Sequence, residues 1–478
     1  MQKNDIFTVK IEDMTNLGFG VAKLEGKVVF VRGAVTGDLA RVKLIKLQSS
    51  YMIGKLVELV EKSPLRLPEG EARCTICACS GCAYKLIGYD EELKIKEDSV
   101  RAVFKKAGLG HIKIQQIVPS PSVLHYRNKA QYPISKDSAG NYLIGFYKPK
   151  THAVCEAACC PLAPEIFSDI LETLRAFFND HSLSVYDEKS RKGLLRHVYL
   201  RRGEISGEIL LTLVITEDSL PFSEELCERI SSRFPSIKGI LLNKNDRDTN
   251  VILGEKYTCI FGRDYIEDTL SGVKLKLTAQ SFYQVNHDAA ELLYKKAKEL
   301  TLPSKNTMLL DLYCGVGSIG LSMADEVGSL IGIEIVDSAI DCAKYNAEQN
   351  GFMNTAFFTG NATDCEKLLS KAESELGEKI RPDVILLDPP RSGCDEKLLN
   401  YISTLGAQRI VYISCNPSTL ARDVVILSGH RYTAGSVTPF DLFPGTGHVE
   451  TVVLLSREKA DDYVRFSVHT KDLKTSMN

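Results

Sequence analysis

The chain has 478 residues, 44% of them hydrophobic, and a formal net charge of −2. This length predicts about three domains of roughly 150 residues each. The near-neutral charge excludes a global basic field, although a local basic face would be enough to contact phosphates. No apolar run approaches the roughly 20 residues needed to cross a bilayer, and the N-terminus has no secretory signal. We therefore expect a cytoplasmic protein.

Four regions follow one another along the chain. Residues 1–62 hold short alternating apolar and polar runs between glycines, which predicts a small antiparallel β-barrel. Residues 70–270 mix short strands and helices and predict an α+β domain, with a helix over 89–108 that packs on the catalytic domain. Residues 271–456 alternate strands and helices, which predicts a parallel, doubly wound sheet. Residues 457–478 form a polar extension without a predicted role.

Three features of the last domain indicate a nucleotide-like ligand. A Gly-x-Gly-x-x-Gly pattern runs from Gly315 to Gly320, between a predicted strand and a helix over 318–327. Such a turn lets the backbone approach a ligand, although a purely structural turn fits the pattern equally well. Glu334 ends the next strand, where it suits ribose hydroxyls. In Asp388–Arg391 the two prolines hold a loop open at the sheet edge where ligands bind. Together these features resemble those of an S-adenosylmethionine-dependent methyltransferase, which is the activity that we expect.

Cys415 ends the fifth predicted strand of this sheet, on the same edge as Asp388. Asn416 can cap the following helix, and Pro417 suits its first turn. A thiol at a helix N-terminus has a lowered pKa, so we expect a reactive thiolate. A lone cysteine is more often an inert core residue, but its place at the ligand-binding edge favours a nucleophile.

The motifs resemble those of the RNA uracil-5-methyltransferase family over nearly the whole chain. The matching segments are SFYQVN (281–286), LLDLYCGVGSIGL (309–321), LLDPPRSG (386–393), SCNPSTLARD (414–423) and DLFPGTGHVETVVLL (441–455). YRNKAQYPI (126–134) is similar to the central domain of that family, and residues 1–60 look like a TRAM domain. The resemblance implies an α/β fold: a Rossmann-like methyltransferase domain, preceded by an OB-like β-barrel and an α+β domain that carries a cysteine cluster.

The chemistry of uracil carbon 5 requires a nucleophile and a base. A thiolate that adds to carbon 6 makes an enolate, which takes a methyl group at carbon 5. A general base must then remove the carbon-5 proton before the thiolate leaves. Cys415 is the predicted nucleophile, and the resemblance implies that Glu450 is the base. It also implies a methyl-donor site of Gln284, Tyr313, Glu334 and Asp388, of which Asp388 could also touch the uracil ring.

Three further residues near the predicted site receive lesser roles. His448 could be mistaken for the base, but the resemblance gives it a structural or positioning role. Cys314 and Cys394 are interpreted as non-catalytic.

Seven of the 14 cysteines fall in two groups: Cys74, Cys77, Cys79 and Cys82, then Cys155, Cys159 and Cys160. In an intracellular chain such thiols favour metal binding over disulfides. Four thiolates can hold zinc or a 4Fe–4S cluster. The resemblance to iron–sulfur members of the family implies a 4Fe–4S cluster, structural or in contact with RNA, on Cys74, Cys79, Cys82 and Cys160. The first spacing is one residue shorter than is usual there, so Cys77 remains an alternative to Cys74.

RNA is the implied partner, with 23S rRNA favoured over tRNA by the resemblance, and we expect a monomer. Basic stretches at 146–150, 196–202 and 391–394 suit phosphate contact and base stacking, or form a solvated surface. A radical methylthiotransferase needs Cys-x-x-x-Cys-x-x-Cys, and Thr75 breaks that spacing. An amino-group methyltransferase would not need Cys415. A catalytically silent RNA-binding protein of this fold would be expected to lack Cys415 or Glu450, and both are present.

Overall fold

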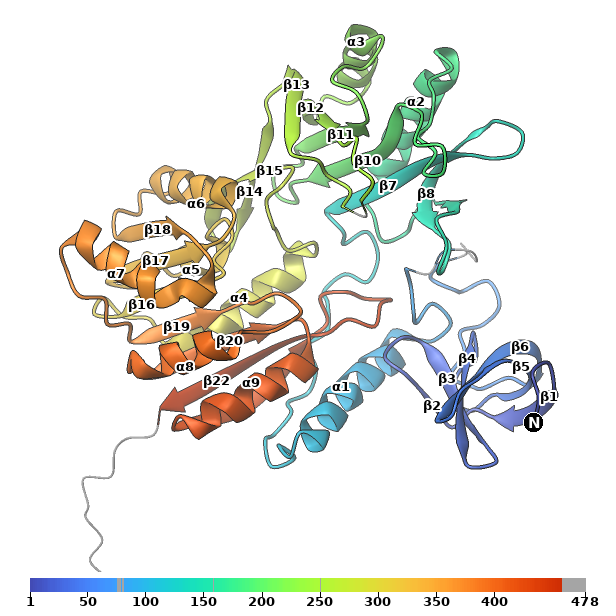
Figure 1. The fold of residues 1–478 in the computed structure, drawn as a ribbon, viewed down its shortest axis with the longest axis horizontal. Coiled ribbons are helices and arrows are strands. Elements are labelled where there is room, and N and C mark those ends of the chain that lie inside the picture. The colour runs from blue at the N-terminus through green and yellow to red at the C-terminus, as the bar shows by residue number, and fades with distance from the viewer. Residues whose placement is uncertain (75–78, 80, 158, 250, 458–478) are drawn as a thin grey trace, which may run out of the picture.

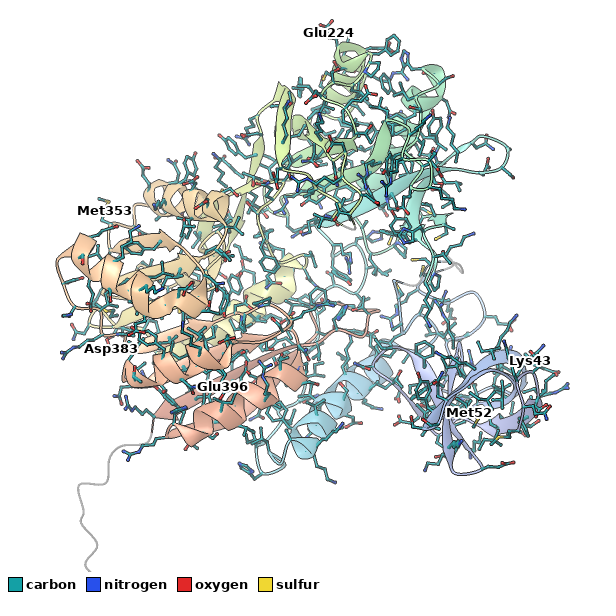
Figure 2. The ribbon with its side chains drawn as sticks, viewed as in Figure 1. Lys43, Met52, Glu224, Met353, Asp383 and Glu396 are labelled. Atoms are coloured by element: carbon teal, nitrogen blue, oxygen red, sulfur yellow. The ribbon has the colours of Figure 1, made fainter. Side chains whose placement is uncertain are left out.

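The structure is a computed structural model that describes residues 1–457 apart from 75–78, 80, 158 and 250. Three lobes are visible in Figure 1, each built around its own sheet. In Figure 2 they are marked by Lys43 and Met52 in the first lobe, Glu224 in the second and Met353 in the third. Within the described part of the chain, no helix is long and apolar enough to span a membrane.

The first lobe is a six-stranded sheet in the order β1-β5-β6-β4-β3-β2. Its strands are β1 Ile6–Lys10, β2 Asp13–Met14, β3 Phe19–Leu24, β4 Lys27–Arg32, β5 Leu39–Leu47 and β6 Tyr51–Glu61. Alternate residues such as Val29, Val31 and Val42 are buried in one core, as strand periodicity requires. The predicted antiparallel pairing holds except between β4 and β6, which run parallel.

The second lobe is a seven-stranded sheet in the order β13-β12-β11-β10-β7-β8-β9. Its strands are β7 Lys129–Lys136, β8 Tyr142–Tyr147, β9 Val154–Glu156, β10 Leu195–Arg202, β11 Ile209–Ile215, β12 Ile237–Lys244 and β13 Lys256–Gly262. Helices α2 (Glu165–Asp180) and α3 (Ser223–Arg233) pack on one face. From the other face Tyr199 and Leu210 join the core of the third lobe. The hairpin of β14 (Tyr265–Leu270) and β15 (Val273–Thr278) also packs into that core.

The third lobe is a seven-stranded sheet in the order β18-β17-β16-β19-β20-β22-β21. Its strands are β16 Met308–Leu312, β17 Ser329–Glu334, β18 Thr355–Thr359, β19 Val384–Leu387, β20 Arg409–Ser414, β21 Tyr432–Phe440 and β22 Glu450–Arg457. The first five in spatial order run parallel, which confirms the predicted α/β fold. The last two, β22 and β21, are antiparallel additions.

Helices cover both faces of the third sheet. Helices α4 (His287–Thr301) and α6 (Asp337–Gln349) pack on one face. The other face is covered by α1 (Tyr89–Lys106), α7 (Cys365–Leu376, after the short turn η1 Ala362–Asp364), α8 (Glu396–Thr404) and α9 (Pro417–Gly429). Although α1 lies far from this sheet in sequence, Figure 1 shows it running beside α9, with which it makes contact.

Helix α5 (Ser318–Leu321) is much shorter than the helix expected over 318–327. After Leu321 the backbone tightens into turns in which several amides reach only three residues back, as from Met323 to Gly320 and from Ala324 to Leu321. The segment therefore contributes a compact turn, rather than a full helix, behind the glycine-rich loop.

Candidate active site

A cavity of about 970 Å³ opens at the carboxyl edge of the parallel strands. This edge is the ligand-binding position expected for a doubly wound sheet. All six predicted catalytic and cofactor residues line this cavity: Gln284, Tyr313, Glu334, Asp388, Cys415 and Glu450. Residues spread over more than 160 positions of sequence therefore share one site.

One end of the cavity is built by the glycine-rich turn after β16. The amide of Gly315 donates to Glu334 Oε2 at 3.2 Å, and the amide of Val336 donates to Oε1 at 3.0 Å. These bonds fix the carboxylate at the end of β17, where two neighbouring hydroxyls of a ribose could donate to it. Tyr313 adopts a left-handed backbone conformation, with φ of 67°. This strained geometry turns the chain sharply into the glycine-rich loop.

Two residues at this end were missed by the sequence analysis. Asp311 on β16 is buried, and its Oδ2 accepts from the amide of Gly320 at 3.1 Å. Burial and the charge of Asp388 raise the pKa of Asp311 to about 8. Phe282 lines the cavity while 61% exposed, an unusual state for a phenylalanine. An exposed ring at a cavity mouth suits stacking against a flat ring, but the surrounding sequence contains no pattern that separates it from Tyr283, which is buried.

The other end of the cavity brings Cys415 close to Glu450. Strand β20 pairs with β22 in antiparallel register, with Ser414 opposite Thr451. The Thr451 hydroxyl donates to the Ser414 carbonyl at 3.0 Å, which ties the two strand ends together. Cys415 directly follows Ser414 and Glu450 directly precedes Thr451, so thiol and carboxyl face the same cavity. Cys415 is half-buried, while Glu450 is only 4% exposed.

The pKa of Cys415 is raised to about 11, which contradicts the lowered value expected for a helix N-terminus. Burial is the main cause, and the charges of Glu450 and Asp388 add to it. Burial likewise raises the pKa of Glu450 well above its usual value and that of Asp388 to about 7. Helix α9 begins as predicted, with the Asn416 side chain accepting from the amide of Ser418 at 3.1 Å. The N-terminus of α9 lowers the pKa of the thiol by less than burial and the two neighbouring carboxyl groups raise it.

Alkylation of Cys415 in the free enzyme is expected to be slow at pH 7 and to accelerate about tenfold per pH unit, because only the thiolate reacts. The rise should continue towards pH 11, since the fraction of thiolate grows until the pH reaches the pKa. Quantitative mass spectrometry of iodoacetamide-labelled peptides measures this rate for Cys415 alone. An alkylation rate that already levels off near pH 7 would instead indicate a thiol with a lowered pKa, as expected from the sequence.

The loop that follows Asp388 is held by α9. The side-chain amide of Asn416 donates to the Arg391 carbonyl at 3.0 Å, and Arg422 donates to the Cys394 carbonyl at 2.8 Å. Asp423 is fully buried and accepts from the amide of Cys394 at 2.9 Å and from the Tyr412 hydroxyl at 2.5 Å. The helix that begins after Cys415 therefore also positions the loop that carries Asp388.

Arg391 of this loop contacts His448, and its guanidinium donates to His448 Nε2 at 3.2 Å. Burial, followed by the charges of Arg391 and Arg127, lowers the pKa of His448 to about 4. His448 is thus neutral near pH 7 and accepts a hydrogen bond. Cys314 and Cys394 are both buried, and burial raises the pKa of both thiols.

Segment 441–449, which leads into Glu450, is anchored by residues from the N-terminal half. Buried Lys96 of α1 pairs with Asp441 and with Glu92, both at 2.7 Å. The carboxylate of Glu92 accepts from the amide of Gly445 at 2.6 Å. At Gly447 a side chain is impossible, because a Cβ atom would lie 1.7 Å from the Asn16 carbonyl oxygen of the first lobe.

The predicted cysteine ligands lie close to one another beside this segment. A hydrogen bond links the thiols of Cys82 and Cys74, and it raises the pKa of Cys82 together with burial and the charges of Cys74, Cys160 and Cys79. The alternative ligand Cys77 lies outside the described residues. In the described ranges, no three or more His, Cys, Asp or Glu side chains form a group that could hold a metal ion.

Comparison with known proteins identifies the family. The model of the tRNA (uracil-5-)-methyltransferase family matches residues 88–458, and the TRAM domain model matches residues 2–57. An uncharacterized RNA methyltransferase of Bacillus cereus is 38% identical over 459 residues, which cover 96% of this chain and 98% of the relative. A second uncharacterized RNA methyltransferase, from Clostridium acetobutylicum, is 36% identical over 462 residues, which cover 96% of this chain and 98% of that relative.

A solved structure extends this similarity to three dimensions. It is the Pyrococcus abyssi tRNA (uracil-54, C5)-methyltransferase in complex with S-adenosyl-L-homocysteine, which is 26% identical. It superposes with a TM-score of 0.75, over 94% of this chain and all of the other. The chain therefore belongs to the tRNA (uracil-5-)-methyltransferase family and is an S-adenosylmethionine-dependent RNA (uracil-5-)-methyltransferase with an N-terminal TRAM domain.

Proposed function

We propose that the enzyme methylates carbon 5 of a uridine through a covalent adduct in which Cys415 is the nucleophile and Glu450 the general base. The observation that carries this proposal is the pairing of β20 with β22, which sets both side chains at one edge of one cavity. A thiol and a carboxyl group are the two groups that substitution at uracil carbon 5 requires.

The Cys415 sulfur adds to carbon 6 of the uracil, and its proton passes to Asp388. With a pKa of about 7, Asp388 is ionised in about half of the molecules at neutral pH. Carbon 5 of the resulting enolate would form a bond to the methyl group of the donor as the methyl–sulfur bond breaks, and the sulfur would keep that electron pair and leave as S-adenosylhomocysteine. Glu450 then removes the proton from carbon 5, and the carbon–sulfur bond breaks to release Cys415.

S-adenosylmethionine, when bound, supplies the methyl group on a positively charged sulfur. The residues that we assign to it are Gln284, Tyr313, Glu334 and Asp388, which share the cavity with Cys415. A positive charge in this cavity lowers the pKa of Glu450 and Asp388. Both carboxyl groups are therefore more ionised in the loaded site than in the free enzyme, as a base must be.

The substrate that we propose is 23S rRNA, as the resemblance to members with both a TRAM domain and a cysteine cluster suggests. Transfer RNA is the second candidate, because the similar Pyrococcus abyssi enzyme is a tRNA methyltransferase. The target base must leave its stack to reach Cys415, which costs least for an unpaired loop uridine.

Mass-spectrometric mapping of 5-methyluridine, in rRNA and tRNA from cells with and without the gene, tests this function. We expect one or more sites in 23S rRNA to lose the methyl group when the gene is deleted. Loss confined to tRNA would select the second candidate. Unchanged 5-methyluridine in both RNAs, together with no transfer in vitro, would refute the function.

For the other domains we propose the division expected from the sequence: RNA binding by residues 1–62, a central domain over 70–270 and catalysis by residues 271–456. We further propose that Cys74, Cys79, Cys82 and Cys160 hold a 4Fe–4S cluster. The support is the hydrogen bond between the thiols of Cys74 and Cys82, together with the charges of Cys79 and Cys160 that act on Cys82. Four thiolate ligands are the usual set for such a cluster, and its role would be structural or in contact with RNA.

Iron and acid-labile sulfide analysis of the anaerobically purified protein tests the cluster. About four iron and four sulfide per chain are expected, with loss of both in the Cys160→Ser variant. Cys259→Ser, at an exposed cysteine on β13, should keep the full content. About one zinc per chain without sulfide would show the alternative, a structural zinc site.

A further inference from the structure

Three cationic side chains gather where β7 begins and β10 ends. Lys129 opens β7 and is the cross-strand partner of Arg201 on β10, while Arg127 lies two residues before Lys129. Arg201 is 1% exposed, and its guanidinium donates to the Tyr199 hydroxyl and the Ser281 carbonyl. Both acceptors are uncharged. The other two cations are half-buried, so they stay within reach of solvent in front of Arg201.

These three cations, Arg127, Lys129 and Arg201, have no carboxylate partner within ion-pair distance in the part of the chain that the structure describes. Other buried cations do have such partners, as Lys96 does in Asp441. Burial, then the charges of Arg201 and Arg127, lowers the pKa of Lys129 to about 8. Like charges that face each other across a strand pair destabilise a sheet, and buried charges are costly unless paired. Because the fold keeps these three cations together at a cost in stability, their arrangement points to an anionic ligand.

The cluster borders the catalytic cavity. The backbone amide of Asn128, between Arg127 and Lys129, donates to the Val285 carbonyl at 2.9 Å, and its side chain donates to the Gln284 carbonyl at 2.8 Å. The cations therefore flank the segment from which Phe282 and Gln284 line the cavity. On the other side, the charge of Arg127 reaches His448, the partner of Arg391.

We propose that Arg127, Lys129 and Arg201 form a phosphate-binding site for the RNA strand that carries the target uridine. This inference rests on the proposed function. Phosphodiester is the anion that an RNA substrate brings to the mouth of this cavity. Arg127 and Lys129 contact phosphate oxygens directly, while buried Arg201 adds charge behind them. Such contacts fix the register of the strand without reading its sequence, which suits a site beside the extruded base.

The test is the salt dependence of RNA binding by the full-length protein. For single strands, log K falls with log salt with a slope of about −0.7 per neutralised phosphate. We expect Lys129→Gln and Arg127→Gln each to make this slope shallower by about 0.7. Binding should weaken by the same factor for a substrate hairpin and for a scrambled RNA of equal length. Lys129→Arg should retain the wild-type slope.

Controls separate this site from others. Lys371→Gln, at an exposed lysine on α7, should leave the slope unchanged. Calorimetric titration with S-adenosylmethionine should give the wild-type affinity for Lys129→Gln, which shows that the fold and the cavity are intact. Weaker S-adenosylmethionine binding would assign the cations to the carboxylate of that ligand and overturn the proposal. So would an unchanged slope in Lys129→Gln, or a loss confined to the substrate sequence, because that indicates a base contact.

These outcomes are independent of the catalytic assignment. If the wild-type enzyme forms 5-methyluridine in RNA while both Gln variants keep the wild-type slope, the phosphate site fails and the function stands. If the wild-type enzyme methylates no RNA, the function itself fails.

Discussion

Replacing Cys415 by Ala should abolish methyl transfer to RNA and leave S-adenosylmethionine binding within about twofold of the wild type. Without the sulfur no bond forms to carbon 6, and carbon 5 stays too weak a nucleophile to take the methyl group. Loss of an enzymatic nucleophile typically lowers kcat by about 10⁴-fold to 10⁶-fold. Transfer of a tritiated methyl group measures the first effect, and calorimetry measures the second.

Binding of the methyl donor should survive because the Gly315–Glu334 end of the cavity does not depend on the thiol. The control is Cys259→Ala, which removes an exposed thiol from β13 and should keep wild-type activity. Turnover of Cys415→Ala at a rate comparable to that of the control would eliminate Cys415 as the nucleophile.

Replacing Glu450 by Gln should trap the enzyme on its RNA. The variant keeps the size of the side chain and its place at the start of β22 but cannot accept the carbon-5 proton. Addition of Cys415 and methyl transfer proceed, whereas elimination stalls, so a methylated covalent adduct accumulates. A denaturing gel with labelled RNA should show a band shifted by the mass of the protein, and multiple turnover should fall by about 10²-fold to 10⁴-fold.

The double variant Cys415→Ala, Glu450→Gln provides the control for the trapped adduct. It should give no shifted band, because the adduct requires the sulfur. Fast turnover of Glu450→Gln, with no shifted band at any time, would show that a group other than Glu450 is the base.

The parallel part of the catalytic sheet was predictable from sequence, and with it one edge of the site. Carboxyl ends of parallel strands collect at one edge, so residues that end successive strands must meet. Glu334 is the last residue of β17, Asp388 directly follows β19 and Cys415 directly follows β20. Strand periodicity and turn residues alone therefore suggest that these three share a ligand.

Glu450 could not be placed in this way. It begins a strand rather than ending one, and β22 is antiparallel and inserted between β20 and β21. No periodicity in residues 441–457 specifies that order. Only the resemblance to a family suggested the residue, and only the register of Ser414 with Thr451 accounts for its closeness to Cys415.

The pKa of Cys415 was predicted with the wrong sign because the local sequence reports only the helix that follows it. Two carboxyl groups, 27 positions upstream and 35 positions downstream in sequence, together with burial, decide the pKa instead. Similarly, the stretch 196–202 was interpreted as a basic face or solvated surface, yet Arg201 is buried against neutral acceptors. Exposure and distant charges are properties of the packed molecule, and a local pattern does not contain them.

The anchoring of segment 441–449 has a consequence for how this protein can be divided. Asp441, one of the two carboxyl partners of Lys96, lies 345 positions away in sequence, and the Asn16 carbonyl of the first lobe leaves no room for a side chain at position 447. A fragment that starts at the methyltransferase domain would keep the sheet and the donor pocket but lose the contacts of Lys96, Glu92 and Asn16 with the segment that leads into Glu450. Catalysis thus depends on contacts between the N-terminal and the C-terminal parts of the chain. Exchange of domains between relatives should succeed only when α1 and the first lobe travel with the catalytic sheet.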